Sequence, residues 1–530
     1  MKKIGLLLLA AATALLVTAG GAAASSGGTF VFCAPYGGDL FSLDMHKTSR
    51  TQDYIVGLNI NRSLYKWDAD QSKPVLDLAT EAKVSADGKT YTFSLRKNVK
   101  FHNGRTLTAD DVIWSYNRIA QPETTSSAAS YIANIDGAEA VIAGKAKTIT
   151  GLEKIDDHTF KMTLKHPVAI GYSLCKVETA IVPREALEGK EAAFATNPVG
   201  CGPFKFVKWV RGSEVILEKF DGYFEPGKPY IDKLVYKIMP EGAARDIAFR
   251  AGELDANIVG ASQYPIYQRD PEIKDNMIEV AEMYTRIIGF NPEFKPFADK
   301  RVRQAINHAI NAELIIKKLL KNKAVPATGY LPTSSPAYEK AMKGYDYNLA
   351  RAKELMKEAG YEDGFTFECI ATANKSWGVG IVEALIPFMK RINITVKPQQ
   401  LEGAALGERC RTGKFDAFIW SIESGPDPLE TLNRFRSTTP RSAGNYTAYA
   451  NADYDKALDQ AAAASSETER IEWVKKANRI LFEDAPFWFF NYNKAIIAYH
   501  PWVHGIKPVA IEMMLQDFTN LKLDDSSPRK

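Results

Sequence analysis

The sequence predicts an α/β protein of several domains, and three observations support this prediction. From about residue 298 onward, strand-like and helix-like segments alternate, as in a βαβ lobe. Up to about residue 195, short alternating segments predict an α+β region with small sheets. A run of turn-forming residues at 197–203 (NPVGCGP) marks a boundary after this first region.

Length, composition and charge narrow the possibilities further. The 530 residues are 45% hydrophobic and 25% charged, which is the composition of globular protein. A chain of this length usually forms about two to four domains. Lys plus Arg number 67 against 63 for Asp plus Glu, and the two signs are interspersed. A nucleic-acid partner would need a basic face or stripe, so this class is excluded.

The first residues are typical of a secretory signal peptide. Lys2 and Lys3 precede an apolar run over residues 4–17, and small residues follow up to Ala24. This apolar run is too short to span a membrane, which takes about 20 residues. Lipid attachment needs a cysteine at the cleavage point, whereas the first cysteine is Cys33. We therefore expect removal of residues 1–24 and a freely soluble periplasmic protein.

The first region contains turn, strand and helix signals in succession. The turn pair Asp87-Gly88 precedes an alternation that predicts half-buried antiparallel strands. Its apolar positions are Tyr91, Phe93, Leu95, Val99 and Phe101. Thr108 suits the N-cap of a following helix. A second strand pattern follows at 160–164.

Beyond the boundary at 197–203, strands are predicted at 204–207 and 215–217, and helices from residue 298. One predicted helical face consists of Val302, Ile306, Ala309, Ile310 and Leu314. A second helix over 349–359 ends at Gly360, a residue suited to the position after a helix. Strands predicted at 365–371, 394–396 and 417–421 alternate with these helices.

Sequence signals for catalysis and for metal binding are missing. The chain has no H-E-x-x-H, G-x-S-x-G, G-x-x-x-x-G-K-[ST] or C-x-x-C motif. Pro501 lies between His500 and His504, which argues against a metal-binding pair on a helix. We predict no enzyme, no cofactor and no metal. The five cysteines, an odd number, leave disulfide pairing open; they are Cys33, Cys175, Cys201, Cys369 and Cys410.

Several strings resemble one known family when they are taken together. The most specific covers residues 85–96, 99–104 and 108–112. Further matches are residues 198–204, 301–306 and 352–361. They resemble, in the family's order, the periplasmic family 5 solute-binding proteins of ABC importers, which include dipeptide- and oligopeptide-binding proteins. Phe32-Cys33 and Asn445-Tyr446 resemble the dipeptide-binding branch.

The resemblance implies a fold and a domain layout. The fold is a two-lobed periplasmic binding protein, class II and cluster C type, with three domains, a ligand cleft between the lobes and a two-strand hinge. Lobe I would comprise residues 25–57, 198–286 and 492–530. An inserted small domain would cover 58–197, and lobe II 287–491. The crossing strands would lie near residues 287–290 and 489–492.

The resemblance also implies a ligand site. Peptide-binding members place an aspartate after a tryptophan, and this carboxylate anchors the ligand's amino terminus. Here Trp420 is followed by Ser421, Ile422 and Glu423, with Asp427 further on. Glutamate replaces the usual aspartate, and one residue is inserted before Asp427. An ammonium removed from water needs a charge-assisted acceptor, so Glu423 is the candidate anchor; the alternative is a solvated loop acid.

The resemblance implies further ligand-binding positions. Lys375 lies where dipeptide-type members place an arginine for the ligand carboxylate, but it lacks the bidentate fork of arginine and can equally be a surface lysine. Two loops are expected to line the cleft, and their glycines permit close backbone approach. These loop residues are Tyr36, Gly37, Gly38, Gly200, Cys201 and Gly202. The aromatic residues Trp377, Trp420 and Tyr446 can wall pockets or belong to the core.

The function implied is capture of a solute and its delivery to an ABC permease and ATPase. A dipeptide- or oligopeptide-like solute is the first expectation, and an opine, a nickel complex, haem or an oligosaccharide is the alternative. We expect a monomer that binds a small solute and no nucleic acid. An exported hydrolase using Glu423 and Asp427 as acid and base is a competing class, without a nucleophile motif to support it. A chaperone or a sensor that uses the same cleft is another.

Overall fold

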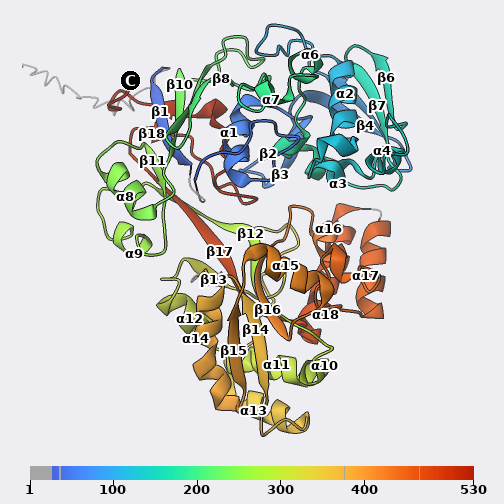
Figure 1. Ribbon diagram of the computed structural model, residues 1–530, viewed down its shortest axis with the longest axis vertical. Helices are drawn as coiled ribbons and strands as arrows, with labels where there is room; N and C mark the ends of the chain where they lie inside the picture. Colours follow the sequence, from blue (N-terminus) through green and yellow to red (C-terminus); the bar gives the residue numbers. More distant parts are fainter. Residues whose placement is uncertain (1–26, 35–37, 375–376, 465) are drawn as a thin grey trace, which may run out of the picture.

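The computed structural model describes residues 27–34, 38–374, 377–464 and 466–530, which form two lobes, one above the other in Figure 1. Two long strands run from one lobe into the other: β12 (Met277–Phe290) and β17 (Phe487–Tyr499). The predicted signal peptide, residues 1–24, lies outside the described residues. Among the residues that are described, no helix combines the length and the apolar character that crossing a bilayer would require.

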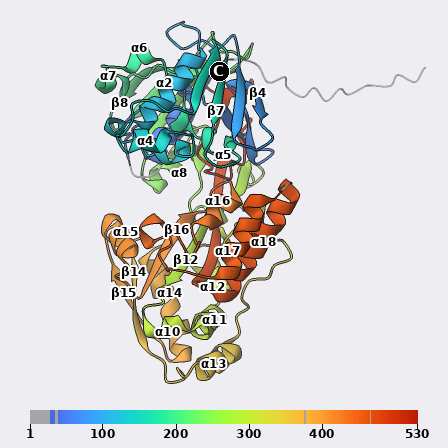
Figure 2. The same cartoon turned by 90° about the vertical axis from the view of Figure 1, so that its right-hand side faces the viewer.

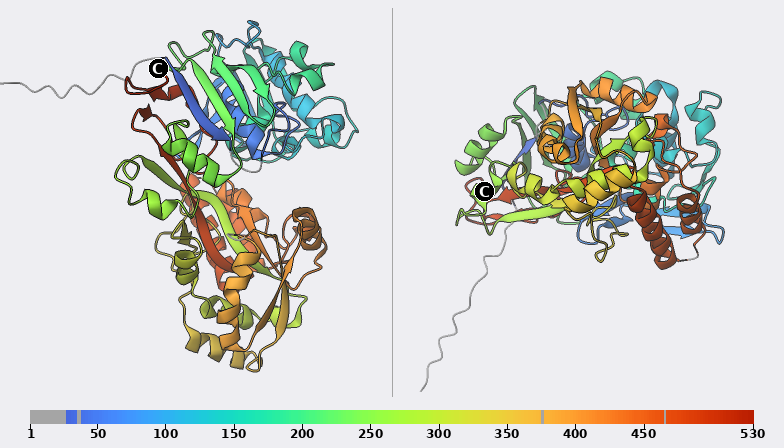
Figure 3. Two further views of the ribbon diagram at one scale, coloured as in Figure 1. Left: turned by 60° about the vertical axis from the view of Figure 1, so that its left-hand side comes forward. Right: turned by 90° about the horizontal axis from the view of Figure 1, so that it is seen from below.

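The crossing strands belong to one sheet that continues through both lobes. Its order is β15-β14-β16-β12-β17-β11-β1-β10-β9-β8, and β13 also pairs with β17. β12 and β17 are antiparallel over most of their length, from Gly289 opposite Phe487 to Met277 opposite Ala498. The left view of Figure 3 shows them side by side between the lobes. Their register shifts between Ala281 and Thr285, so the ladder is interrupted where the chain passes from one lobe to the other.

Lobe I is built on the upper half of this sheet. Its strands are β1 (Thr29–Ala34), β8 (Phe204–Val210), β9 (Glu214–Lys219), β10 (Lys233–Ile238), β11 (Ala256–Ile258), β18 (Val503–His504) and β19 (Lys522–Leu523). Its helices are α1 (Thr51–Ile60), α8 (Gly242–Arg250) and α9 (Tyr264–Tyr267). The strand signals at 204–207 and 215–217 are confirmed as β8 and β9. Phe30 and Phe32 of β1 are buried against Phe518, which ties the start of the chain to its end.

The inserted domain has its own small sheet, in the order β4-β5-β7-β6. Its strands are β2 (Tyr65–Asp68), β3 (Lys73–Leu76), β4 (Ala79–Val84), β5 (Thr90–Leu95), β6 (Leu152–Asp156) and β7 (Thr159–Thr163). Its helices are α2 (Ala109–Ala120), α3 (Ala129–Ile132), α4 (Ala138–Ile142), α5 (Gly171–Leu174), α6 (Arg184–Leu187) and α7 (Glu191–Phe194). Thr108 is the N-cap of α2, as predicted, and its backbone N–H donates to the Asp111 carboxylate at 2.9 Å.

Lobe II has helices on both faces of the lower half of the sheet. Its strands are β13 (Ala324–Pro326), β14 (Thr366–Ala371), β15 (Thr395–Gln400) and β16 (Ala417–Glu423). Its helices are α10 (Lys295–Ala298), α11 (Lys300–Ala309), α12 (Ala312–Lys318), α13 (Leu349–Glu358), α14 (Val379–Met389), α15 (Gly403–Thr412), α16 (Pro428–Asn433), α17 (Ala452–Ala463) and α18 (Glu467–Asp484). Figure 2 shows α17 and α18 at one side of this lobe and β14 and β15 at the other.

Two local expectations from the sequence are wrong. Val99 and Phe101 are buried but form no strand beside β5, because β5 pairs with β4 on one side and with β7 on the other. The single helical face expected from Val302 to Leu314 is broken, since α11 ends at Ala309 and Asn311 caps a new helix, α12. Leu314 is exposed as a result.

Candidate ligand-binding cleft

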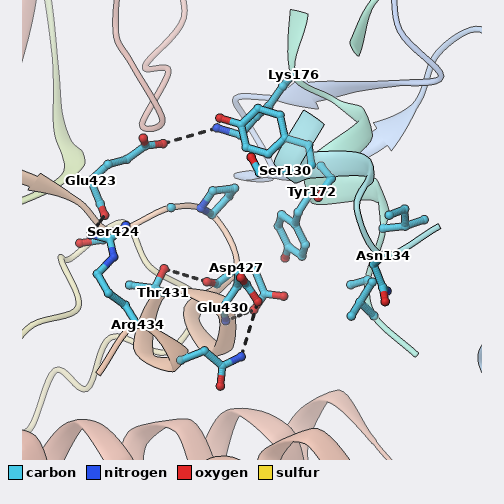
Figure 4. Close-up of a pocket in the computed structure, with 18 of the residues that line it drawn as sticks. Ser130, Asn134, Tyr172, Lys176, Glu423, Ser424, Asp427, Glu430, Thr431 and Arg434 are labelled. Atoms are coloured by element: carbon cyan, nitrogen blue, oxygen red, sulfur yellow. Dashed lines mark hydrogen bonds and ion pairs between the residues drawn. The ribbon is translucent and has the colours of Figure 1, made fainter. Parts of the chain in front are cut away.

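A cavity of about 730 Å³ lies between the inserted domain and lobe II. From the inserted domain, Ser130, Asn134, Tyr172 and Lys176 line it. From lobe II, Glu423, Asp427, Glu430, Thr431 and Arg434 line it. Figure 4 shows the two groups facing one another across the space. The cavity therefore has one wall on each lobe, so a solute bound there would contact both.

Glu423 lies at the end of β16, opposite Tyr284 in the ladder between β12 and β16. The first three residues of this strand are buried, and the chain leaves it at Ser424 to form the turn before α16. The Glu423 side chain is 43% exposed, and its Oε1 is 3.5 Å from Nζ of Lys176. Its carboxylate thus points into the cavity towards the opposite lobe.

Lys176 belongs to the segment between α5 and the short turn of 3-10 helix at Val177–Thr179. Its side chain is 22% exposed, and Nζ lies 4.8 Å from the centre of the Tyr131 ring. Burial lowers the pKa of this ammonium, but Glu423 and, after it, Tyr131 and Glu178 together outweigh that effect and hold the pKa of Lys176 above its usual range. Lys176 is therefore a charged cation on the wall opposite Glu423.

Asp427 occupies a different environment from Glu423 although it lines the same cavity. Its carboxylate caps α16 by accepting the backbone N–H of Leu429 at 2.9 Å. Arg470 of α18 donates to both carboxylate oxygens, at 2.6 and 2.7 Å, and the two side chains are each 15% exposed. Asp427 is thus engaged by groups of its own lobe, which argues against the hydrolase in which it would act as an acid or base.

The structure does not bring Gly200, Cys201 and Gly202 to this cavity. All three are buried where the chain passes α1, and the N–H of Gly202 donates to the carbonyl of Ile60 at 2.8 Å. A Cβ on Gly200 would clash with the carbonyl oxygen of Ile60. Glycine does permit a close backbone approach here, but the neighbouring backbone is that of α1 and not a ligand.

The remaining predicted site residues have mixed positions. Trp420 and Tyr446 pack together, with ring centres 5.9 Å apart, and Ile422 is buried in the same core of lobe II. Ser421 is half-buried in β16 opposite Arg286, and Trp377 is half-buried at the turn before α14. Gly38 has a φ of 113°. Tyr36, Gly37 and Lys375 lie outside the described residues.

Sequence reasoning missed the wall that the inserted domain contributes. Tyr172 and Lys176 come from a stretch of very short helices, in which no amphipathic period is long enough to detect. One signal was available. Over residues 167–183, Lys176 and Glu178 are the only charged side chains in an otherwise uncharged segment. A charged side chain needs an ion-pair or hydrogen-bond partner when its segment is buried. For Lys176 this partner is Glu423 of lobe II.

The sequence left the pairing of the cysteines open, and it predicted no metal site. All five cysteines are buried free thiols. Burial raises the pKa of Cys175 and of Cys201 to about 12, which keeps both thiols protonated. Within the described part of the chain, no group of three or more His, Cys, Asp or Glu side chains is placed to hold a metal ion.

Comparison with known proteins agrees with this architecture. The profile of the bacterial extracellular solute-binding proteins, family 5 Middle, matches residues 73–443. The chain belongs to this family. The match runs from the inserted domain to the far end of the cavity wall on lobe II, so it includes both Lys176 and Glu423.

Individual members of the family align along most of their length. The glutathione-binding protein GsiB of Pectobacterium atrosepticum is 28% identical over 474 residues, covering 87% of this chain and 88% of the relative. The dipeptide-binding protein of Escherichia coli is 26% identical over 490 residues, covering 86% and 88%. The periplasmic binding protein DppA of Helicobacter pylori, solved with the peptide STSA, has a TM-score of 0.77 at 25% identity, covering 94% of this chain and 99% of that one.

Proposed function

We propose that this protein is the solute-binding component of an ABC importer and that it captures a peptide-like solute between its lobes. The cavity shared by the inserted domain and lobe II carries this proposal, because a carboxylate, Glu423, points into it from the end of a strand paired with β12. Similar proteins named for dipeptide and glutathione binding, and one solved with a bound peptide, support a peptide-like ligand.

In this proposal Glu423 accepts the ammonium of the ligand. A peptide ammonium that leaves water needs an ionised acceptor, and a charge-assisted hydrogen bond is about twice as strong as a neutral one. Closure of the lobes would remove water from the 43% of the Glu423 side chain that is now exposed. The strand ladder that is interrupted between Ala281 and Thr285 gives the lobes a place at which to move.

The proposal includes location and partners. The basic and apolar start of the sequence supports export to the periplasm, and the family supports delivery to a membrane permease with its ATPase. The protein would act as a monomer, since one chain provides both walls of the cavity.

The experiment compares two carboxylates of the same wall. Removing one partner of a buried charge pair costs about 2 to 5 kcal/mol, so Glu423→Gln should weaken binding by about 30-fold to several thousandfold. Glu430→Gln, on α16 and also at the cavity, is the matched control and should change affinity less than about tenfold. The measurement is calorimetric titration with alanyl-alanine, a tri-alanine peptide and glutathione.

Two results would count against the proposal. Failure of all three probes to bind the unmodified protein would argue against a peptide-like solute and favour an opine, a nickel complex, haem or an oligosaccharide. Binding by Glu423→Gln within about fivefold of the unmodified protein would remove Glu423 as the anchor, because an exposed ion pair contributes only about 0 to 1 kcal/mol.

A further inference from the structure

Lys176 stands opposite the proposed ammonium acceptor, and nothing in the proposed function uses it. Its Nζ is 3.5 Å from Oε1 of Glu423, and the pair joins the inserted domain to lobe II. The Tyr131 ring beneath the ammonium and the partly buried stem fix its position. Lys176 therefore places a positive charge, in a fixed position, where the ligand ammonium would bind.

This arrangement creates a problem of charge. A ligand ammonium placed on Glu423 would come close to the Lys176 ammonium, and like charges repel more strongly as the cleft loses water. Arg434 adds a further cation on the lobe II wall, with Nη1 3.5 Å from the main-chain carbonyl of Glu423. Within the described residues, the guanidinium of Arg434 has no carboxylate at ion-pair distance.

The neighbouring acids do not solve this problem. Asp427 is engaged by Arg470. Burial raises the pKa of Glu178, two residues after Lys176, and burial together with Glu282 raises the pKa of Glu512, so burial disfavours the charged form of both carboxyls. A ligand that brought only an ammonium would therefore place three cations, including Lys176 and Arg434, around the Glu423 carboxylate, with Glu430 of α16 as a further acid on the same cavity wall. A ligand that also brings a carboxylate restores the balance.

We propose that Lys176 receives a ligand carboxylate beside the ammonium held by Glu423, so that the cleft selects solutes with both groups on one carbon atom. This inference rests on the proposed function, because it keeps Glu423 as the ammonium acceptor. Acceptor and donor are 3.5 Å apart, which suits groups that are neighbours in the ligand. In an ordinary peptide the terminal charges are further apart, since each extended residue spans about 3.3 to 3.6 Å.

The solute class that follows is peptides or conjugates with a free α-amino-acid head, such as those linked through the side-chain carboxyl of glutamate. Two isomers test this directly. The α-linked and γ-linked forms of glutamyl-alanine have the same composition and the same charge, but only the γ-linked form has an ammonium and a carboxylate on one carbon. Because a hydrogen bond to a charged group contributes more than a hydrogen bond between neutral groups, we expect the γ-linked isomer to bind at least about tenfold more tightly.

Variants connect this preference to Lys176. Lys176→Met keeps the apolar stem and removes the charge, and it should reduce the preference for the γ-linked isomer to below about threefold. Lys176→Arg should restore much of it, because the cation is kept. Lys161→Met is the matched control: this lysine is in β7 of the same domain and forms an exposed ion pair with Glu153. It should leave the preference unchanged, and circular dichroism would confirm that each variant is folded.

The outcomes separate this inference from the proposed function. Equal binding of the two isomers, tighter binding of the α-linked isomer, or a preference that survives Lys176→Met would overturn the inference. If alanyl-alanine binds while neither glutamyl isomer does, the inference fails and the proposed function stands. If no peptide probe binds at all, both fail.

Discussion

The two walls of the cavity are held in place by different kinds of contact. On lobe II, Asp427 caps α16 and is clamped by Arg470, so this wall depends on ionised groups. On the inserted domain, the segment that carries Lys176 is held by His46, whose Nε2 is 2.9 Å from the carbonyl of Ala180. His46 is buried, and burial and then the nearby Arg118 lower its pKa to about 4, so this wall depends on a neutral ring.

The difference shows which groups are available to a ligand. Asp427 has donors on both sides and both oxygens occupied, so it stabilises the protein and has little to offer a solute. Glu423, four residues earlier, is 43% exposed, and its carboxylate lies 3.5 Å from the Lys176 ammonium of the inserted domain. Two carboxylates of one short segment thus have different environments: Asp427 is engaged within its own wall, and Glu423 faces the cavity.

The largest effect is expected from breaking the lobe II wall. Asp427→Ala removes the cap of α16 and leaves Arg470 with only its contact to the exposed Glu467, which should lower the free energy of unfolding by about 2 to 4 kcal/mol. Urea denaturation measures this change. Asp459→Ala, which breaks only an exposed pair with Arg436, should cost less than about 1 kcal/mol. Equal losses in the two variants would contradict the stabilising role given to Asp427.

Acid should weaken the other wall. The pKa of His46 is about 4 in the folded protein and about 6.5 in the unfolded chain, so between these values the unfolded state binds the proton first. The contribution of His46 is present above about pH 6.5 and is lost as the pH falls towards about 4. From pH 7 to pH 5 the loss should be about 2 kcal/mol.

His46→Gln checks this expectation, because glutamine can still donate to the Ala180 carbonyl but does not titrate. Urea denaturation at pH 7 and at pH 5 should show a loss that is about 2 kcal/mol smaller in the variant than in the unmodified protein. If both proteins lose the same stability over this range, His46 is not the group that titrates.

The smallest effect is expected for the stability of the ligand-free protein when Glu423 is changed. Glu423→Gln breaks an exposed pair at 3.5 Å, so the free energy of unfolding should change by less than about 1 kcal/mol. This variant sharpens the comparison with Asp427→Ala, because both substitutions remove one carboxylate from the same wall. A loss as large as that of Asp427→Ala would mean that Glu423 also maintains the fold.

Local sequence signals predicted those parts of the fold that local physics determines. The N-cap at Thr108, the end of a helix at Gly360 and the strands β8, β9, β14, β15 and β16 follow from capping chemistry and from apolar periodicity. Leu314 shows the limit, because its period fits one continuous helix while the cap at Asn311 starts another.

The candidate site was predicted only in part, for a physical reason. Glu423 was found because it follows a strand within a family motif, but Lys176 reaches the cavity through the docking of short helices, which no local pattern encodes. The glycines at 200 and 202 show a second limit. Their presence indicates a close backbone approach, yet the sequence does not tell whether a ligand or Ile60 is the neighbour.

The position of β17 in the sheet bears on the order in which the molecule can be assembled. This strand is formed by residues 487–499, late in the chain, yet it lies between β11 of lobe I and β12, and it also pairs with β13. Lobe II can gather most of its strands from a contiguous stretch, whereas the sheet of lobe I stays incomplete until β17 arrives. Contacts between such distant segments form slowly, because a long loop has to close first. We therefore expect lobe I, although it is made first, to be completed last.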